Sequence, residues 1–254
     1  MTRTGRRDSQ EGGDATLLEA AKKEPNLTES AYSSLRADLL ACRLRPGEKL
    51  SIASLSTDLG VSLGAVREAL ARLTAEGLVI AETNRGFRAA PVSESELLDL
   101  TSARIEMESA CLRRAIRNGD VTWESEIVAA HHLMSRIPER AADDTGRLNE
   151  AWAEAHRDFH SALVSACDSP WRLRLREFLY DQTERYRQLS VPALPTERNL
   201  ATEHQALMEA TLARDEEHAC KLLAEHLNIT AGRVRVLAEP SAENSKTQMR
   251  GRGK

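Results

Sequence analysis

The chain has 254 residues, of which 41% are hydrophobic and 29% charged, and its formal net charge is −4. This composition is typical of a chain that forms a buried core, in one large or two ordinary domains. No apolar run approaches the ~18 residues that a membrane helix needs, and the start MTRTGRRDSQEGGD has no apolar segment behind its charges. We therefore expect a cytoplasmic protein with no membrane partner and no secretory signal.

Cysteines and aromatic residues are few. The four cysteines form no CxxC pair and are scattered along the chain: Cys42, Cys111, Cys167 and Cys220. We interpret them as reduced core residues of a cytoplasmic protein, and not as a disulfide framework. With only three Trp, three Tyr and three Phe, the core must be packed mostly by Leu and Ala, which favours helices.

The charges are unevenly distributed along the chain. Residues 28–92 carry 8 Lys/Arg against 7 Asp/Glu, whereas residues 93–240 carry 18 against 26. Charges act on a partner over a Debye length of about 8–10 Å. The acidic total therefore does not exclude nucleic acid, because only the first of these segments needs to meet it.

Two helices are predicted in the first quarter of the chain. Residues 1–27 are interpreted as a flexible N-terminal tail, with a possible short helix in ATLLEAAKKE. Thr28 is predicted to be the N-cap of the first helix, which ends at the turn signal RPGEKL. Ser51 can cap a short second helix that stops at Gly60.

A third helix and a β-hairpin follow. Ser62 can cap the helix SLGAVREALARLTAEG, which Gly77 ends. LVIAE and FRAAPV are predicted to form a hairpin with Asn84, Arg85 and Gly86 at its tip. Over residues 28–92 this order predicts a winged helix-turn-helix DNA-binding domain, although a small helical protein-interaction module can share the pattern.

Nearly every segment after residue 92 predicts helix. Apolar residues recur at spacings of three and four, and short polar stretches separate roughly six such segments. We predict an all-α helical bundle over residues 93–238, for effector binding and dimerisation, and a flexible C-terminal tail over 239–254. The fold class is thus mostly α: an N-terminal winged helix-turn-helix and a C-terminal all-α bundle.

Motifs in both halves resemble one known family. REALARLTAEGLV and the following RGFRAAPV resemble the GntR family of bacterial transcription regulators. The second half, with FH near residue 160, EH near 204 and AEHL near 226, is similar to the FCD domain of the FadR-like branch. The resemblance implies a homodimer that binds double-stranded operator DNA, with the third helix in the major groove and the wing at the minor groove or backbone.

The candidate DNA-binding residues lie at the start of the third helix and at the wing tip: Ser62, Leu63, Gly64, Arg67, Arg85 and Gly86. N-terminal side chains of a recognition helix are those that reach base edges. Arg67 matches the arginine of the family's REAL motif and can bond a guanine or a phosphate. Many members carry an arginine where this chain has Leu63, so their operator sequences do not transfer to it. Solvated surface arginine is the alternative interpretation of Arg67 and Arg85.

The stretch HRDFH places His156 and His160 on one helix face, because residues four apart are neighbours. FCD domains that hold a metal use a D-x3-H pair and two later histidines, which His160, His204 and His226 match. His156 stands where an Asp or Asn is usual. The resemblance thus implies a divalent transition metal, and four neutral imidazoles favour such a cation over Mg²⁺ or Ca²⁺. Zn²⁺ is the first candidate, and Ni²⁺ and Fe²⁺ are the others. Hydrogen-bonded core histidines are the alternative.

Arginines near such a metal are candidates for binding an anionic effector. Arg104 matches the family's Arg-x-x-x-Glu helix and can pair a carboxylate bidentately, and Arg187 is a second candidate. Either arginine can instead form a salt bridge between helices or protomers.

The function predicted from these features is a transcription repressor that a small organic acid, bound at a metal site, releases from DNA. The alternatives are a metal-sensing regulator and a helical-bundle metalloenzyme. The stretch HRDFH argues against a zinc hydrolase, because it has Arg157 where the zinc-protease motif HExxH has its general-base Glu.

Overall fold

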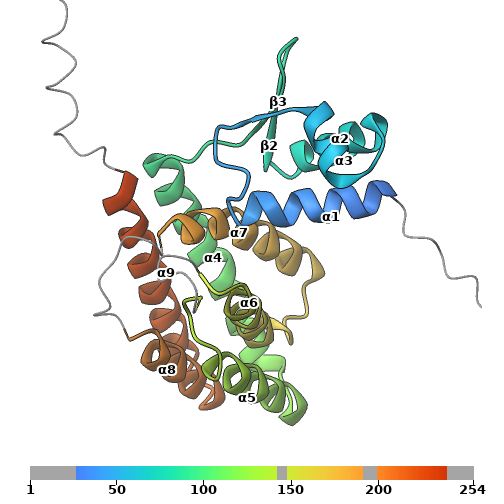
Figure 1. Cartoon of the computed structure of the whole chain (residues 1–254). Helices are drawn as coiled ribbons and strands as arrows, with labels where there is room; N and C mark the ends of the chain where they lie inside the picture. The colour runs from blue at the N-terminus through green and yellow to red at the C-terminus, as the bar shows by residue number, and fades with distance from the viewer. Residues whose placement is uncertain (1–26, 142–147, 191–198, 239–254) are drawn as a thin grey trace, which may run out of the picture.

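The structure is a computed structural model that describes residues 27–141, 148–190 and 199–238. Figure 1 shows a small winged unit that lies across one end of a larger group of helices. The interpretations made for residues 1–26 and 239–254, including a helix in ATLLEAAKKE, fall outside the described residues. No helix in the described part of the chain is long and apolar enough to cross a membrane.

The winged unit contains three helices and a small sheet. Its elements are α1 (Leu27–Leu40), β1 (Lys49–Leu50), α2 (Ile52–Leu59), α3 (Leu63–Ala75), β2 (Val79–Glu82) and β3 (Gly86–Ala89). Because α1 begins at Leu27, Thr28 lies inside its first turn, and the prediction that Thr28 caps the helix was wrong. Helix ends fray and are the least certain part of a sequence-based assignment.

Local sequence signals fix the helix-turn-helix. Ser51 caps α2 by accepting a hydrogen bond from the Ser54 amide, and Ser62 caps α3 by accepting one from the Ala65 amide. Gly60 ends α2 in the left-handed region at φ +64°, where a residue with a Cβ is strained. Both caps and the glycine stop confirm the prediction.

The wing has three strands, where the sequence predicted two. The strand order is β1-β3-β2, with both pairs antiparallel, and Leu50 pairs with Phe87. A strand of two residues is too short to show an alternating pattern, and its partner lies 37 residues further along the chain (50 to 87). The extra strand ties the base of the wing to the segment that precedes α2.

The larger unit is formed only of helices within the described ranges. These are α4 (Glu94–Asn118), α5 (Val121–Ser135), α6 (Glu150–Val164), α7 (Pro170–Ser190), α8 (Leu200–Leu212) and α9 (Glu216–Ala238). The long helix α4 packs against α6, α7 and α9. A large buried cluster, which includes Phe159, Leu163, Leu207 and Leu223, fills much of the space between the helices, and a smaller one joins Leu97, Tyr186 and Ala231. The mostly α fold class is confirmed.

Candidate metal centre and DNA-binding surface

The start of α3 is a solvent-exposed surface. Ser62, Leu63, Gly64 and Arg67 are all exposed, and the side chain of Leu63 stands out with 53% of its area accessible. The opposite face of α3 is buried through Val66, which packs in the core of the winged unit. The candidate DNA-binding residues in the first two turns of α3 therefore face away from the rest of the protein.

The arginines of the winged unit differ in their partners. Arg67 and Arg85 are exposed, and within the described part of the chain neither guanidinium forms an ion pair. Arg72, one turn further along α3, is held by Glu29 at 2.7 Å and lies over the Tyr32 ring at 3.7 Å. Arg67 and Arg85, like Arg45 before α2, therefore have no ion pair in the described part of the chain that would compete with a phosphate or a base.

The wing tip is a tight turn. Asn84 and Gly86 adopt positive φ angles of 60° and 90°. Asn and Gly are the residues that tolerate this region, and the glycine has open space beside it. Arg85 is held between them at the exposed end of the hairpin.

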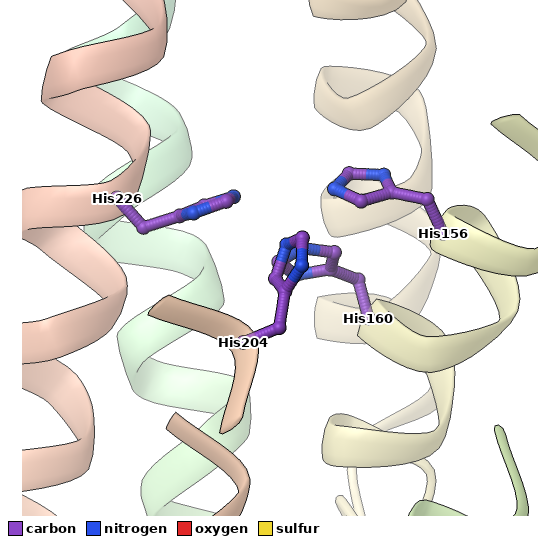
Figure 2. Close-up of side chains that lie close together, drawn as sticks. All are labelled: His156, His160, His204 and His226. Atoms are coloured by element: carbon purple, nitrogen blue, oxygen red, sulfur yellow. The ribbon is translucent and has the colours of Figure 1, made fainter. Parts of the chain in front are cut away.

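The four histidines that the sequence singled out come together inside the helical unit. His156 and His160 project from α6, His204 from α8 and His226 from α9, and Figure 2 shows the four rings pointing toward one another. One nitrogen from each ring lies within 4.8 Å of those of the others. Two nitrogens on one metal at about 2.1 Å are at most about 4.2 Å apart, so side-chain shifts of under about 1 Å would complete a site.

The helix geometry places these rings. Residues four apart share a helix face, and the ring centroids of His156 and His160 are 4.5 Å apart. Asp158, two residues from each, is exposed and is not part of the cluster. His131 and His132 on α5 and His218 on α9 do not belong to the cluster.

Two histidines are held by groups outside the cluster. The Nδ1 atom of His226 lies 2.9 Å from a carboxylate oxygen of Glu203, and Nδ1 of His156 lies 3.2 Å from the Tyr180 hydroxyl. Trp152 stacks on His156 with centroids 4.8 Å apart. When Nδ1 donates to such a partner, the lone pair of Nε2 is left to face the centre of the cluster, as in metal-binding histidines.

His160 provides the strongest physical signal at the cluster. It is 1% exposed, and neither of its ring nitrogens has a hydrogen-bond partner among the described residues. Burying a polar group without a partner costs about 1–3 kcal/mol, so such groups call for an explanation. A metal ion bound by the cluster would satisfy one of these nitrogens.

The environment keeps the imidazoles neutral. Burial lowers the pKa of both His156 and His160 well below the usual value of 6.5, and neighbouring histidines lower it further. Burial also raises the pKa of Tyr180 to about 12, so this hydroxyl stays protonated. Neutral imidazole is the form that binds metal, so this donor set fits a borderline cation such as Zn²⁺.

A group of buried arginines borders the histidines. Glu108 is 1% exposed and accepts from Nε of Arg104 at 3.2 Å and from Nε of Arg176 at 3.0 Å. Both arginines lie close enough to His160 for their charges to lower its pKa. One carboxylate thus faces two guanidinium groups, and the trio carries a net positive charge.

Arg187 borders the cluster at His156 and Trp152. It pairs with Glu184 one turn earlier on α7, and its guanidinium lies 5.3 Å from the centre of the Trp152 ring. Its charge lowers the pKa of His156. Arg104 and Arg187 therefore both border the histidines, and each forms a salt bridge with a glutamate of its own helix and, within the described residues, not with another helix. Binding of an effector by either arginine stays a prediction.

Comparison with known proteins identifies the family. Residues 27–88 match the family model described as bacterial regulatory proteins, gntR family, and residues 99–229 match that of the FCD domain. The HTH-type transcriptional regulator BphR of Paraburkholderia xenovorans is 40% identical over 228 residues, which cover 88% of this chain and 93% of that protein. The chain belongs to the GntR family. This GntR-family regulator also shares 36% identity with the HTH-type transcriptional repressor GlaR of Escherichia coli, over 77% of this chain and 90% of that one.

The fold agrees with that membership. The structure of Escherichia coli McbR/YncC superposes with a TM-score of 0.69 at 22% identity, covering 84% of this chain and 99% of that one. The families and the named relatives are transcription regulators, so this GntR-family chain is a DNA-binding transcription regulator with an FCD domain, and not an enzyme.

Three residues at the cluster were missed from the sequence: Tyr180, Glu203 and Arg176. Glu203 directly precedes His204, but its contact is with His226, 23 residues away. Tyr180 lies 24 residues from His156, and Arg176 lies 68 residues from Glu108. The abundance of arginine in PWRLRLREF was the one available signal, and a solvated helix face explains such a run equally well.

Proposed function

We propose that this GntR-family regulator is a repressor whose FCD domain holds a divalent transition metal at His156, His160, His204 and His226, and that a small organic acid bound there releases it from DNA. The observation that carries the proposal is the buried His160 ring with no partner among the described residues, inside a cluster of four convergent imidazoles. When bound, the metal would supply a Lewis-acidic position that takes a carboxylate oxygen.

The protein's own residues give the site its preference for an anion. Four neutral imidazoles leave the full +2 charge of a metal in place, and the trio of Arg104, Arg176 and Glu108 adds one positive charge beside it. A buried excess of positive charge is costly until an anion enters. Arg176 is 4% exposed, and its Nη2 has no partner in the described part of the chain, so it is a further candidate for pairing a carboxylate.

The proposal assigns DNA binding to residues 28–92 and effector binding and dimerisation to residues 93–238. A homodimer presents two copies of α3 to a pseudo-palindromic operator, with Arg67 and the exposed start of the helix at base edges and Arg85 at the wing contact. The regulator would act in the cytoplasm, where it meets DNA and the acid.

The test is a thermal-shift screen of small mono- and dicarboxylates on the purified protein, with and without added Zn²⁺. A ligand present at 100 times its Kd stabilises by about 2.7 kcal/mol, which is readily measured as a rise in Tm. We expect zinc alone to raise Tm, and an acid to raise it further only with zinc present. The same acid should weaken binding to the DNA upstream of the chain's own gene. If zinc neither binds nor changes Tm, the metal site is wrong.

A metal-sensing regulator is the second candidate. Its supporting observation is that four histidines already make a complete tetrahedral donor set, which leaves no ligand position for an acid. In that case the metal alone would set DNA affinity, and none of the acids would add to the effect of zinc.

A further inference from the structure

The segment of α7 from Tyr180 to Arg185 contacts both the histidine cluster and the winged unit. The hydroxyl of Tyr180 lies 3.2 Å from His156 Nδ1. Two residues later, Gln182 donates to the backbone carbonyl of Glu76 at 2.6 Å. Arg185 donates to the carbonyls of Ala90 and Pro91 at 2.8 and 2.7 Å. In Figure 1 this helix lies directly beneath α1.

Asp181 stands between Tyr180 and Gln182 and accepts from two arginines of different elements. Arg157 of α6 donates at 2.5 Å, and Arg36 of α1 donates to the other carboxylate oxygen. Arg36 also pairs with Glu76 at 3.1 Å, and Glu76 is the C-cap residue of α3. A continuous series of ion pairs therefore joins α6, α7, α1 and the end of the recognition helix.

The order of residues along the chain connects this series to the histidines. Arg157 directly follows His156 in α6, and Asp181 directly follows Tyr180 in α7. His156 and Tyr180 contact each other, and so do Arg157 and Asp181. A shift of one helix against the other at the first contact must also act on the second, because helices move as rigid elements.

The pairs at Asp181 are less buried than those of Glu108 with Arg104 and Arg176, but more sheltered than the exposed bridges of the chain. The Asp181 side chain is 9% exposed, and those of Arg36 and Arg157 are 27% and 28% exposed. By contrast, Asp168 accepts two hydrogen bonds from Arg114, but the two side chains are 52% and 40% exposed. Exposed pairs contribute little to stability or coupling, whereas half-buried pairs depend strongly on geometry.

We propose that Arg157, Asp181, Arg36 and Glu76 form a relay that sets the position of the recognition helix according to the state of the histidine cluster. These are positioning residues: none is a metal ligand, and none lies on the exposed start of α3. The inference rests on the proposed function, because it needs a cluster that changes state on binding. The inference adds the path by which a change at the histidine cluster reaches α3.

The experiment uses the full chain and zinc alone as the probe. DNA affinity for the upstream region is measured with zinc and with chelator for the wild type, Asp181→Asn, Arg36→Gln and the double variant. Asp168→Asn is the control, because it also removes a carboxylate that accepts two hydrogen bonds from an arginine, but one that contacts neither the winged unit nor the histidines. Hydrogen exchange at the C-terminal turn of α3 is followed in the same samples.

Allosteric coupling is typically 5- to 150-fold, so we expect zinc to change wild-type DNA affinity by about tenfold and to alter exchange in α3. In Asp181→Asn the zinc-dependent change should fall below about twofold while zinc still binds at the same stoichiometry. Asp168→Asn should behave as the wild type. Because both residues act on one path, the double variant should lose no more coupling than either single variant.

The outcomes separate the two proposals. If zinc does not bind the wild type, the proposed metal site fails, and the relay fails with it. If zinc binds but the zinc-dependent change is the same in Asp181→Asn as in the wild type, or is absent from the wild type, the relay alone is overturned. Should Asp181→Asn not fold, Arg36→Lys and Asp181→Glu, which keep the charges but change the geometry, provide the same comparison.

Discussion

Replacing His160 with leucine separates a metal site from a packed histidine core. The ring is 1% exposed, and both of its nitrogens are without a partner among the described residues. An unpaired buried polar group costs about 1–3 kcal/mol, and a leucine of similar size removes this cost. We therefore expect His160→Leu to stabilise the metal-free protein by roughly 1–3 kcal/mol, where most core substitutions destabilise.

The same substitution should reduce the stabilisation by zinc. At a thousand times its Kd, zinc adds about 4 kcal/mol to the wild type. Even the loss of a supporting hydrogen bond weakens metal binding 10- to 100-fold, and a lost ligand should cost at least as much. A hundredfold weaker site adds only about 1.4 kcal/mol at the same zinc concentration.

The assay is thermal unfolding of both proteins in chelator and in zinc. For domains of 150–250 residues, 1 kcal/mol corresponds to a shift of about 2–4 °C, so both effects are measurable. His218→Gln, an exposed histidine on α9, is the control and should change neither value by more than about 0.5 kcal/mol. The reasoning is refuted if His160→Leu lowers the Tm of the metal-free protein, or if its response to zinc equals that of the wild type.

Three further predictions concern pH, the support of the site, and DNA. Because burial depresses the pKa of His156 and His160, only the unfolded state gains protons below pH 6.5. The metal-free protein should thus lose up to about 1.4 kcal/mol per pH unit for each ring as pH falls below 6.5; urea unfolding that gives equal stability at pH 7.5 and 5.5 would contradict this. Glu203→Gln should weaken zinc binding about 10- to 100-fold in a competition titration, and unchanged affinity would mean that its contact with His226 gives no support. Arg67→Ala should weaken DNA binding by about 1–3 kcal/mol, whereas Arg72→Ala, whose arginine is already paired with Glu29, should cost less in the same gel-shift series.

The presence of four imidazoles distinguishes this chain from the pattern that the FCD resemblance implied. With His156 in the position usually held by Asp or Asn, none of the four candidate ligands is negatively charged. Glu203 contacts His226 at Nδ1, while Glu108 and Glu184 are engaged by Arg104, Arg176 and Arg187. In the proposed function, a carboxylate from outside the chain supplies a negatively charged ligand. The substitution His156→Asp tests this idea, because it would supply a negatively charged ligand from the chain itself.

Local signals in the sequence were sufficient for the helix-turn-helix of the winged unit. Ser51, Gly60 and Ser62 act through backbone groups within four residues of themselves, so their effect is the same in any fold. The pairing of β1 with β3 was not predictable in this way, because it joins residues 37 positions apart and depends on how the helices bring them together.

Some features of the candidate site also followed from the sequence, and others depended on the tertiary structure. The spacing of His156 and His160 fixes their common face by helix geometry alone, and the likeness to FCD domains linked them to His204 and His226. Only the packing of α6, α8 and α9 places the four rings at one point, and only it brings Tyr180, Glu203 and Arg176 beside them. The contact between Arg36 and Asp181 spans 145 residues. Contacts of this kind are set by which helices share a core, and hydrophobic periodicity tells which face of a helix is buried but not what lies against it.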